Sequence, residues 1–177
     1  MNISPKLTEF LQRHKKLINE NRFYELYSIA EFYTSTIDYS FLPQMTSIFL
    51  LAGMNPLQHM KEVPVAYLAE TSIDKIMIPE GIQRIRYAAF KDCSELKEVY
   101  LPNSLVGISD MAFYGCSSLS KLVIMNPFIR PSAAAFLGVD NINEITYNGT
   151  IEQWSKLKIK NKSNNVICTD GIWTGDN

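Results

Sequence analysis

One motif occurs twice at a fixed distance, and this distance is the strongest constraint on the fold. The stretch AFKDCSEL at 89–96 returns as AFYGCSSL at 112–119, 23 residues later. Stepping back from Phe90 by the same interval reaches Tyr67, so a half-repeat precedes the first full one. An ungapped period of this length predicts a solenoid, in which each repeat forms one coil. The aligned columns are Ala89, Ala112 and Ala135; Phe90, Phe113 and Phe136; Leu96, Leu119 and Ile142; and Ile76, Val99, Leu122 and Ile145.

Two of the three cysteines occupy one column of the repeat. Cys93 and Cys116 align, and Val139 takes the position in the third copy. A metal-ligand or redox column would not tolerate valine, whereas a buried apolar column would. We therefore predict two reduced core cysteines. A lateral disulfide between adjacent coils stays open as an alternative, because neighbouring coils can bring such positions within reach.

The repeat resembles the BspA-like leucine-rich repeats. The resemblance rests on IPEGIQRIRYAAFKDCSELKEVYLP at 78–102 and LPNSLVGISDMAFYGCSSLSKLVI at 101–124, and it extends over about 64–173. The third copy, at 125–147, departs from the pattern, since Pro131 replaces the isoleucine of Ile85 and Ile108. That departure is typical of a terminal repeat. The resemblance implies a leucine-rich repeat solenoid with an interaction role. From the sequence motifs we expect no catalytic residues, no metal and no cofactor.

Each copy contains a short stretch in which apolar residues alternate with others, at 75–78, 98–101, 121–124 and 144–147. We predict an α+β fold in which about four to five short parallel strands stack into a sheet, with Pro79 and Pro102 ending the first two. The Ala-Phe segments are expected on the opposite side as helical turns. Two outward rows follow from the register: a charged row of Lys75, Glu98, Lys121 and Glu144, and a second row of Met77, Tyr100, Val123 and Thr146.

These eight residues are our candidate protein-binding site. The charged row is also explained as a solvated ladder, in which opposite charges on neighbouring strands favour the register. The second row is largely apolar although it faces away from the core, which is typical of a surface where a partner docks. Cover by a neighbouring segment or by a second copy, as in a homodimer, is the alternative.

Residues 1–62 do not follow the repeat and are predicted to be a helical subdomain of four short helices. Ser4 and Pro5 suit the N-cap and first turn of a helix, and apolar spacing continues it through His14 to Ile18. Further helices are expected after Asn21-Arg22, over 43–52 before Gly53, and from Pro56. This subdomain should cap the coil, which solenoids require. It is similar to N-terminal segments of phage and gut-bacterial repeat proteins.

The solenoid is assigned to 63–147, and 148–177 to a C-terminal cap and tail. The tail resembles the segment that closes BspA-like arrays, although one expected tryptophan between Trp154 and Cys168 is missing. Four lysines alternate with other residues here, which predicts a protected edge strand; a phosphate-binding stripe is the alternative. They are Lys156, Lys158, Lys160 and Lys162.

Composition narrows the class of function. With a net charge of -1, the chain lacks the excess of positive charge that attracts nucleic acid or an anionic membrane. We expect neither as a partner. The first residues lack the apolar segment of a secretory signal, so we expect a cytoplasmic protein. Because no phosphate-binding, nucleophile or metal motif occurs, we expect no enzyme. The expected function is protein binding through the sheet; the alternatives are a phage-encoded inhibitor of a host defence protein acting through the helices, and an enzyme with a site between helices and solenoid.

Overall fold

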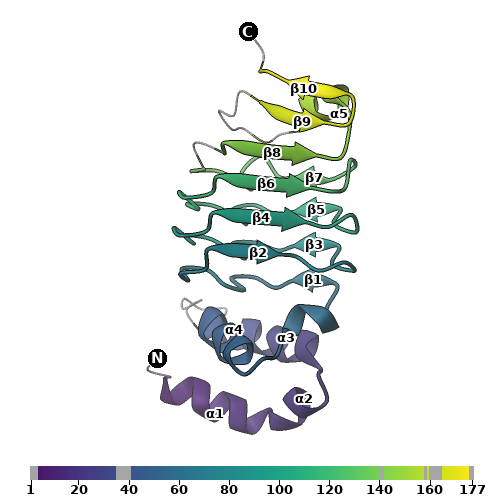
Figure 1. Ribbon diagram of the computed structural model, residues 1–177. Coiled ribbons are helices and arrows are strands. Elements are labelled where there is room, and N and C mark those ends of the chain that lie inside the picture. The colour runs from purple at the N-terminus through teal and green to yellow at the C-terminus, as the bar shows by residue number, and fades with distance from the viewer. Residues whose placement is uncertain (1–3, 35–40, 140–141, 158, 160–164, 176–177) are drawn as a thin grey trace.

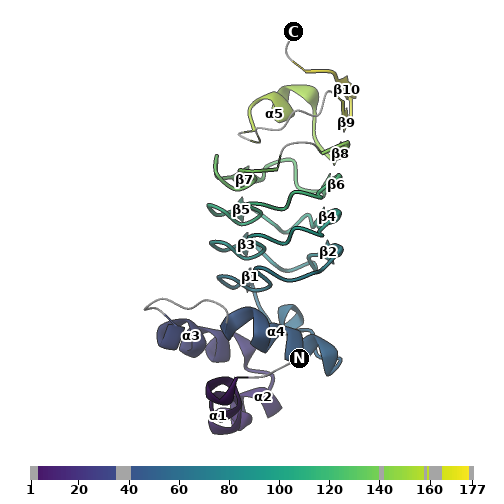
Figure 2. The same cartoon turned by 90° about the vertical axis from the view of Figure 1, so that its left-hand side faces the viewer.

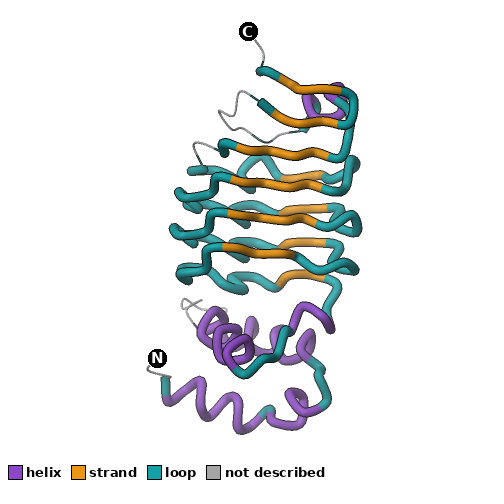
Figure 3. The backbone as a smooth tube through the Cα atoms, viewed as in Figure 1, coloured by secondary structure: helices purple, strands orange, loops and turns teal. Residues whose placement is uncertain are grey.

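The computed structural model describes residues 4–34, 41–139, 142–157, 159 and 165–175. Helices form one end of the molecule, and stacked coils with strands on two walls form the rest (Figures 1 and 3). This arrangement confirms the expected α+β solenoid with an N-terminal helical cap. The elements are α1 (Pro5–Arg13), α2 (Lys15–Asn19), α3 (Phe23–Thr34), α4 (Phe41–Leu51), η1 (Pro56–His59), β1 (Glu62–Val63), β2 (Lys75–Met77), β3 (Arg84–Ile85), β4 (Glu98–Leu101), β5 (Gly107–Ile108), β6 (Lys121–Ile124), β7 (Arg130–Pro131), β8 (Glu144–Tyr147), α5 (Ile151–Ser155), β9 (Val166–Cys168) and β10 (Gly171–Trp173).

The helices at the N-terminal end begin and end close to the residues that local sequence signals indicate, and the helix predicted over 43–52 is α4, Phe41–Leu51. Ser4 caps α1, since its Oγ accepts a hydrogen bond from the backbone N–H of Leu7 at 3.2 Å. Gly53, after α4, adopts the left-handed conformation (φ 74°) that ends a helix. The single helix predicted through Ile18 is wrong: the chain breaks at His14 (φ -105°, ψ 19°) into α1 and α2. The His14 ring nitrogen lies 2.9 Å from the carbonyl oxygen of Phe10, four residues earlier, a local contact that apolar spacing does not reveal.

The stacked coils form two sheets that face each other on opposite sides of the solenoid (Figure 2). One wall is a six-stranded sheet in the order β10-β9-β8-β6-β4-β2, parallel except for the β9–β10 hairpin. The other is a four-stranded parallel sheet in the order β1-β3-β5-β7. The predicted helical turns are wrong: the Ala-Phe segments form tight non-helical turns that follow this second wall. Each strand of the second wall has only two residues and buries only one, so it leaves no alternating pattern in the sequence.

An aromatic spine fills the space between the walls. Phe113 is fully buried between Phe90 and Phe136, with ring centroids 5.1 Å and 5.0 Å away, which confirms the predicted column. Tyr67 contacts Phe90 edge-on with ring centroids 6.3 Å apart, and Tyr27 of α3 lies 5.8 Å from Tyr67. The spine therefore runs from the coils into the helical end, and one hydrophobic core spans both.

The cysteine column is buried and reduced, as the valine in the third copy indicates. The Cys93 thiol donates to the carbonyl oxygen of Leu68 at 3.0 Å, and the Cys116 thiol to that of Phe90 at 3.1 Å. Both cysteines are free, so the alternative of a lateral disulfide is wrong. Burial raises the pKa of both thiols, that of Cys116 far above its ordinary value. The column therefore ties each coil to the preceding one and exposes no thiolate.

The C-terminal end is closed by α5 and the β9–β10 hairpin. Trp154 of α5 lies 5.4 Å from the Tyr147 ring and 6.3 Å from the Trp173 ring. The edge strand predicted for the lysines is wrong at Lys156, which directly follows α5 and pairs with Glu152 at 2.6 Å. Lys158, Lys160 and Lys162 lie outside the described residues.

Candidate protein-binding face

The eight predicted site residues lie in register on four neighbouring strands. In the strand register, Glu98 lies beside Lys75 on one side and beside Lys121 on the other. Glu144 lies beside Lys121 and continues the row. Tyr100 lies between Met77 and Val123 in the second row, which Thr146 extends. Because residues two apart on a strand point to the same side, both rows share the outer face of the six-stranded sheet. In Figure 1 this sheet faces the viewer.

The charged row forms ion pairs along the sheet. Lys75 Nζ lies 3.1 Å from a Glu98 carboxylate oxygen, and Lys121 Nζ lies 2.6 Å from a Glu144 oxygen. Hydrogen bonds from Lys75 and then Tyr100 hold the pKa of Glu98 below its ordinary value. The carboxylate beside each lysine raises the pKa of Lys75 and of Lys121. These shifts keep Lys75, Glu98 and Lys121 charged at neutral pH.

Tyr100 is held in place by the charged row beside it. Its hydroxyl donates to a Glu98 carboxylate oxygen at 2.9 Å. The ammonium of Lys75 lies 4.7 Å from the centre of its ring, within the range of a cation–π contact. The half-buried ring is thus oriented before any partner arrives, which lowers the entropy lost on binding.

The apolar row continues beyond the residues that the repeat predicts. Ile167 of β9 is opposite Thr146, and Ile172 of β10 is opposite Ile167. Their side chains are 51% and 60% exposed, and Met77 at the other end of the row is 64% exposed. We define the apolar row by its six residues, one on each strand of the sheet: Met77, Tyr100, Val123, Thr146, Ile167 and Ile172.

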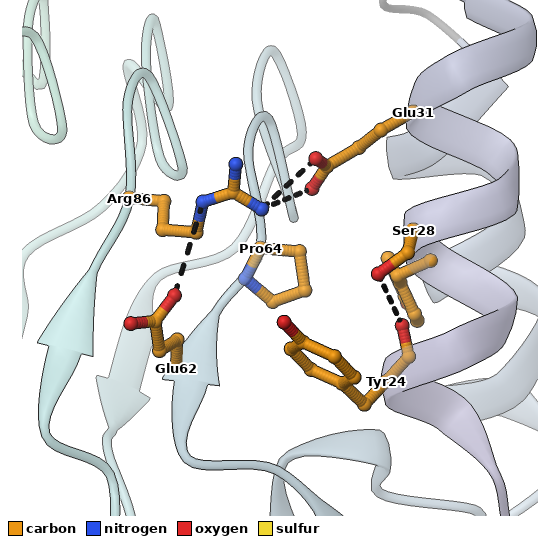
Figure 4. A pocket seen from close by; sticks show the side chains of 7 residues that line it. Tyr24, Ser28, Glu31, Glu62, Pro64 and Arg86 are labelled. Carbon is orange, nitrogen blue, oxygen red and sulfur yellow. Dashed lines mark hydrogen bonds and ion pairs between the residues drawn. The ribbon is translucent and has the colours of Figure 1, made fainter.

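A second candidate lies where the helices meet the first coils (Figure 4). Arg86 contacts both oxygens of Glu31 at 2.8 Å and 2.9 Å, and Glu62 at 3.9 Å. The Ser28 hydroxyl donates to the carbonyl oxygen of Tyr24, so its proton is not directed toward a base. These contacts join α3 to the solenoid and do not assemble a nucleophile with an activating group. The hollow is lined by Tyr24, Tyr27, Ser28, Glu31, Glu62, Pro64 and Arg86.

Within the described ranges, no group of three or more His, Cys, Asp or Glu side chains is arranged to hold a metal ion. None of the helices in those ranges is long and apolar enough to cross a membrane.

Stacked coils, two parallel walls and a continuous aromatic core define a repeat solenoid with one long outer sheet face. The chain belongs to the BspA type leucine-rich repeat family, since residues 61–167 match six copies of that repeat. The match spans well over half of the chain, which confirms the resemblance found in the sequence. No curated protein and no solved structure gives a significant match. Leucine-rich repeats are in general protein-interaction modules and are typically non-catalytic.

Proposed function

We propose that this protein is a non-catalytic, cytoplasmic interaction module that binds a protein partner through the outer face of its six-stranded sheet. The observation that carries the proposal is the apolar row, which places one side chain per strand across the whole sheet. Met77, Ile167 and Ile172 of this row are apolar and exposed, and Tyr100 and Val123 are half-buried. Exposed apolar side chains aligned in this way favour contact with another apolar surface. A concave or flat solenoid wall is also the surface that repeat proteins use for binding.

The charges of the face support a protein partner over a nucleic acid. A nucleic-acid site concentrates unpaired lysine and arginine, and its affinity falls steeply with salt. Here each lysine of the charged row has a carboxylate within salt-bridge distance. The face is therefore suited to a partner whose contact is mainly apolar.

Affinity capture with matched variants tests this proposal. Wild type, Val123→Ser with Ile167→Ser, and Arg130→Ser are immobilised and exposed to host lysate, and retained proteins are quantified. Arg130 is an exposed residue on β7, on the opposite wall, and serves as the control. A protein retained by wild type and by Arg130→Ser but lost from the sheet-face double variant supports the proposal. Equal retention on all three would contradict it.

A second candidate surface lies on the helical end. Leu50, Leu51 and Met54, at the end of α4 and just beyond it, are 40%, 77% and 40% exposed. Such a cluster suits the alternative in which a phage-encoded protein inhibits a host protein through its helices. Leu51→Ser, added to the capture series, separates the two: loss of the retained protein from this variant alone places the interface on the helices.

A further inference from the structure

The order of charges along the charged row is complementary to the same order read in reverse. From β2 to β8 the row runs Lys75, Glu98, Lys121 and Glu144, so its charges alternate and its two ends carry opposite signs. Read backward, the row starts with a glutamate and ends with a lysine. Two copies of the face placed together in opposite stacking directions therefore bring each lysine opposite a glutamate.

This complementarity selects one symmetry axis. A twofold axis parallel to the strands, midway between β4 and β6, reverses the stacking order and keeps each row opposite itself. It places Lys75 opposite Glu144 of the second copy, and Glu98 opposite Lys121 of the second copy. A twofold axis along the stacking direction would instead put like residues at the same level, where like charges repel. The alternating order favours the first axis only.

The same twofold rotation places the apolar rows of the two copies opposite each other. Tyr100 lies opposite Val123 of the second copy, and Met77 lies opposite Thr146 of the second copy. Packed sheets lie about 10 Å apart, a distance that pairs of long side chains can span. The oriented ring of Tyr100 would then fill the space beside Val123 on both sides of the axis.

We propose that the partner of the sheet face includes a second copy of this chain, bound face to face about this axis. The inference rests on the proposed function, since it names an occupant for the same surface. Ile167 and Ile172 lie beyond the four matched strands, and in this arrangement they lie opposite the helical end of the second copy. Strands of three or four residues offer a small area, so we expect a concentration-dependent dimer rather than a permanent one.

Three proteins of identical net charge test the pairing. In Lys121→Glu with Glu144→Lys, the row becomes Lys, Glu, Glu, Lys, which puts like charges opposite each other across the axis. The ion pair of residues 121 and 144 is only inverted, and Lys75, Glu98 and Tyr100 keep their identities. Because Glu98 gains a glutamate as its neighbour at 121, thermal melts check the fold of this variant. Adding Lys75→Glu and Glu98→Lys gives Glu, Lys, Glu, Lys, which is complementary to itself again.

Sedimentation equilibrium of the full chain over a wide concentration range measures the association. We expect wild type and the fourfold variant to dimerise, and the dissociation constant of the double variant to rise at least tenfold. Thermal melts should show all three folded. Mixing wild type with the fourfold variant should give no mixed dimer, because like charges then meet across the axis.

Two outcomes would overturn the dimer. Equal dimerisation of all three proteins would place the interface elsewhere, and a monomeric wild type at the highest concentration would show that a second copy does not bind. In either case, loss of a captured host protein from the sheet-face variant would leave the proposed function standing. Failure of both experiments would remove the sheet face as an interface.

Discussion

Phe113 and Phe136 stack with their ring planes only 6° apart and their centroids separated by 5.0 Å. Phe113→Ala should cost about 3–5 kcal/mol of unfolding free energy, because it removes buried apolar atoms and leaves a cavity in the spine. Phe128→Ala is the matched control, since the Phe128 side chain is 72% exposed and its loss should change stability by less than about 0.5 kcal/mol. Denaturant unfolding measures both. A loss below about 1 kcal/mol for Phe113→Ala would refute the role of the spine.

The buried thiols should not react with thiol reagents while the protein is folded. Burial raises the pKa of Cys93, Cys116 and Cys168, so the reactive thiolate is scarce at pH 8. We expect a thiol reagent such as dithionitrobenzoate to label the native chain only as fast as it opens, and the urea-unfolded chain at once. Rapid labelling of the native chain would show an accessible thiol.

Replacing the cysteine column tests whether it has a role beyond packing. Cys93→Val with Cys116→Val follows the valine that the third copy already uses. The variant should fold and retain its partner, with a modest loss of stability from the two missing hydrogen bonds to carbonyl oxygens. A cooperatively folded variant that no longer binds would revive a ligand or redox role.

The helices and the coils should fold as one unit. Tyr27 packs on Tyr67, and Glu31 forms an ion pair with Arg86. An aromatic contact and an ion pair therefore both join the helices to the coils. Removing residues 1–60 would uncover this end of the core, and we expect the 61–177 fragment to aggregate where the full chain stays dispersed. Size-exclusion chromatography with light scattering distinguishes the two. A monomeric fragment with a sharp melting transition would mean that the helices are an independent domain.

The register of the site was predictable because the repeat is ungapped through the first four strands of the sheet. A constant interval of 23 residues fixes which residues lie side by side, and Lys75, Glu98 and Lys121 are indeed paired neighbours. The extension of the apolar row was not predictable from the period. Helix α5 and the segment after it separate β8 from β9, so Ile167 does not follow the interval, and β10 reverses direction.

The second wall was missed for a different reason. A two-residue strand such as β3 buries Ile85 and exposes Arg84, and a single apolar residue carries no periodicity. Its pairing depends on the stacking of coils that the first wall fixes. The ring contact of Tyr27 with Tyr67 was likewise out of reach, because it joins two segments that no repeat relates.

The affinity of Tyr100→Ala for the captured partner shows whether the sheet face binds protein. Tyr100 lies inside the apolar row, and its removal should shift folding stability by less than about 1 kcal/mol. An oriented tyrosine at an interface contributes about 2 kcal/mol or more, so titration calorimetry should show affinity about thirtyfold weaker than wild type. Tyr100→Phe, which keeps the ring, should lose less. Unchanged affinity for Tyr100→Ala, with binding abolished by Leu51→Ser, would contradict the account and place the interface on the helices.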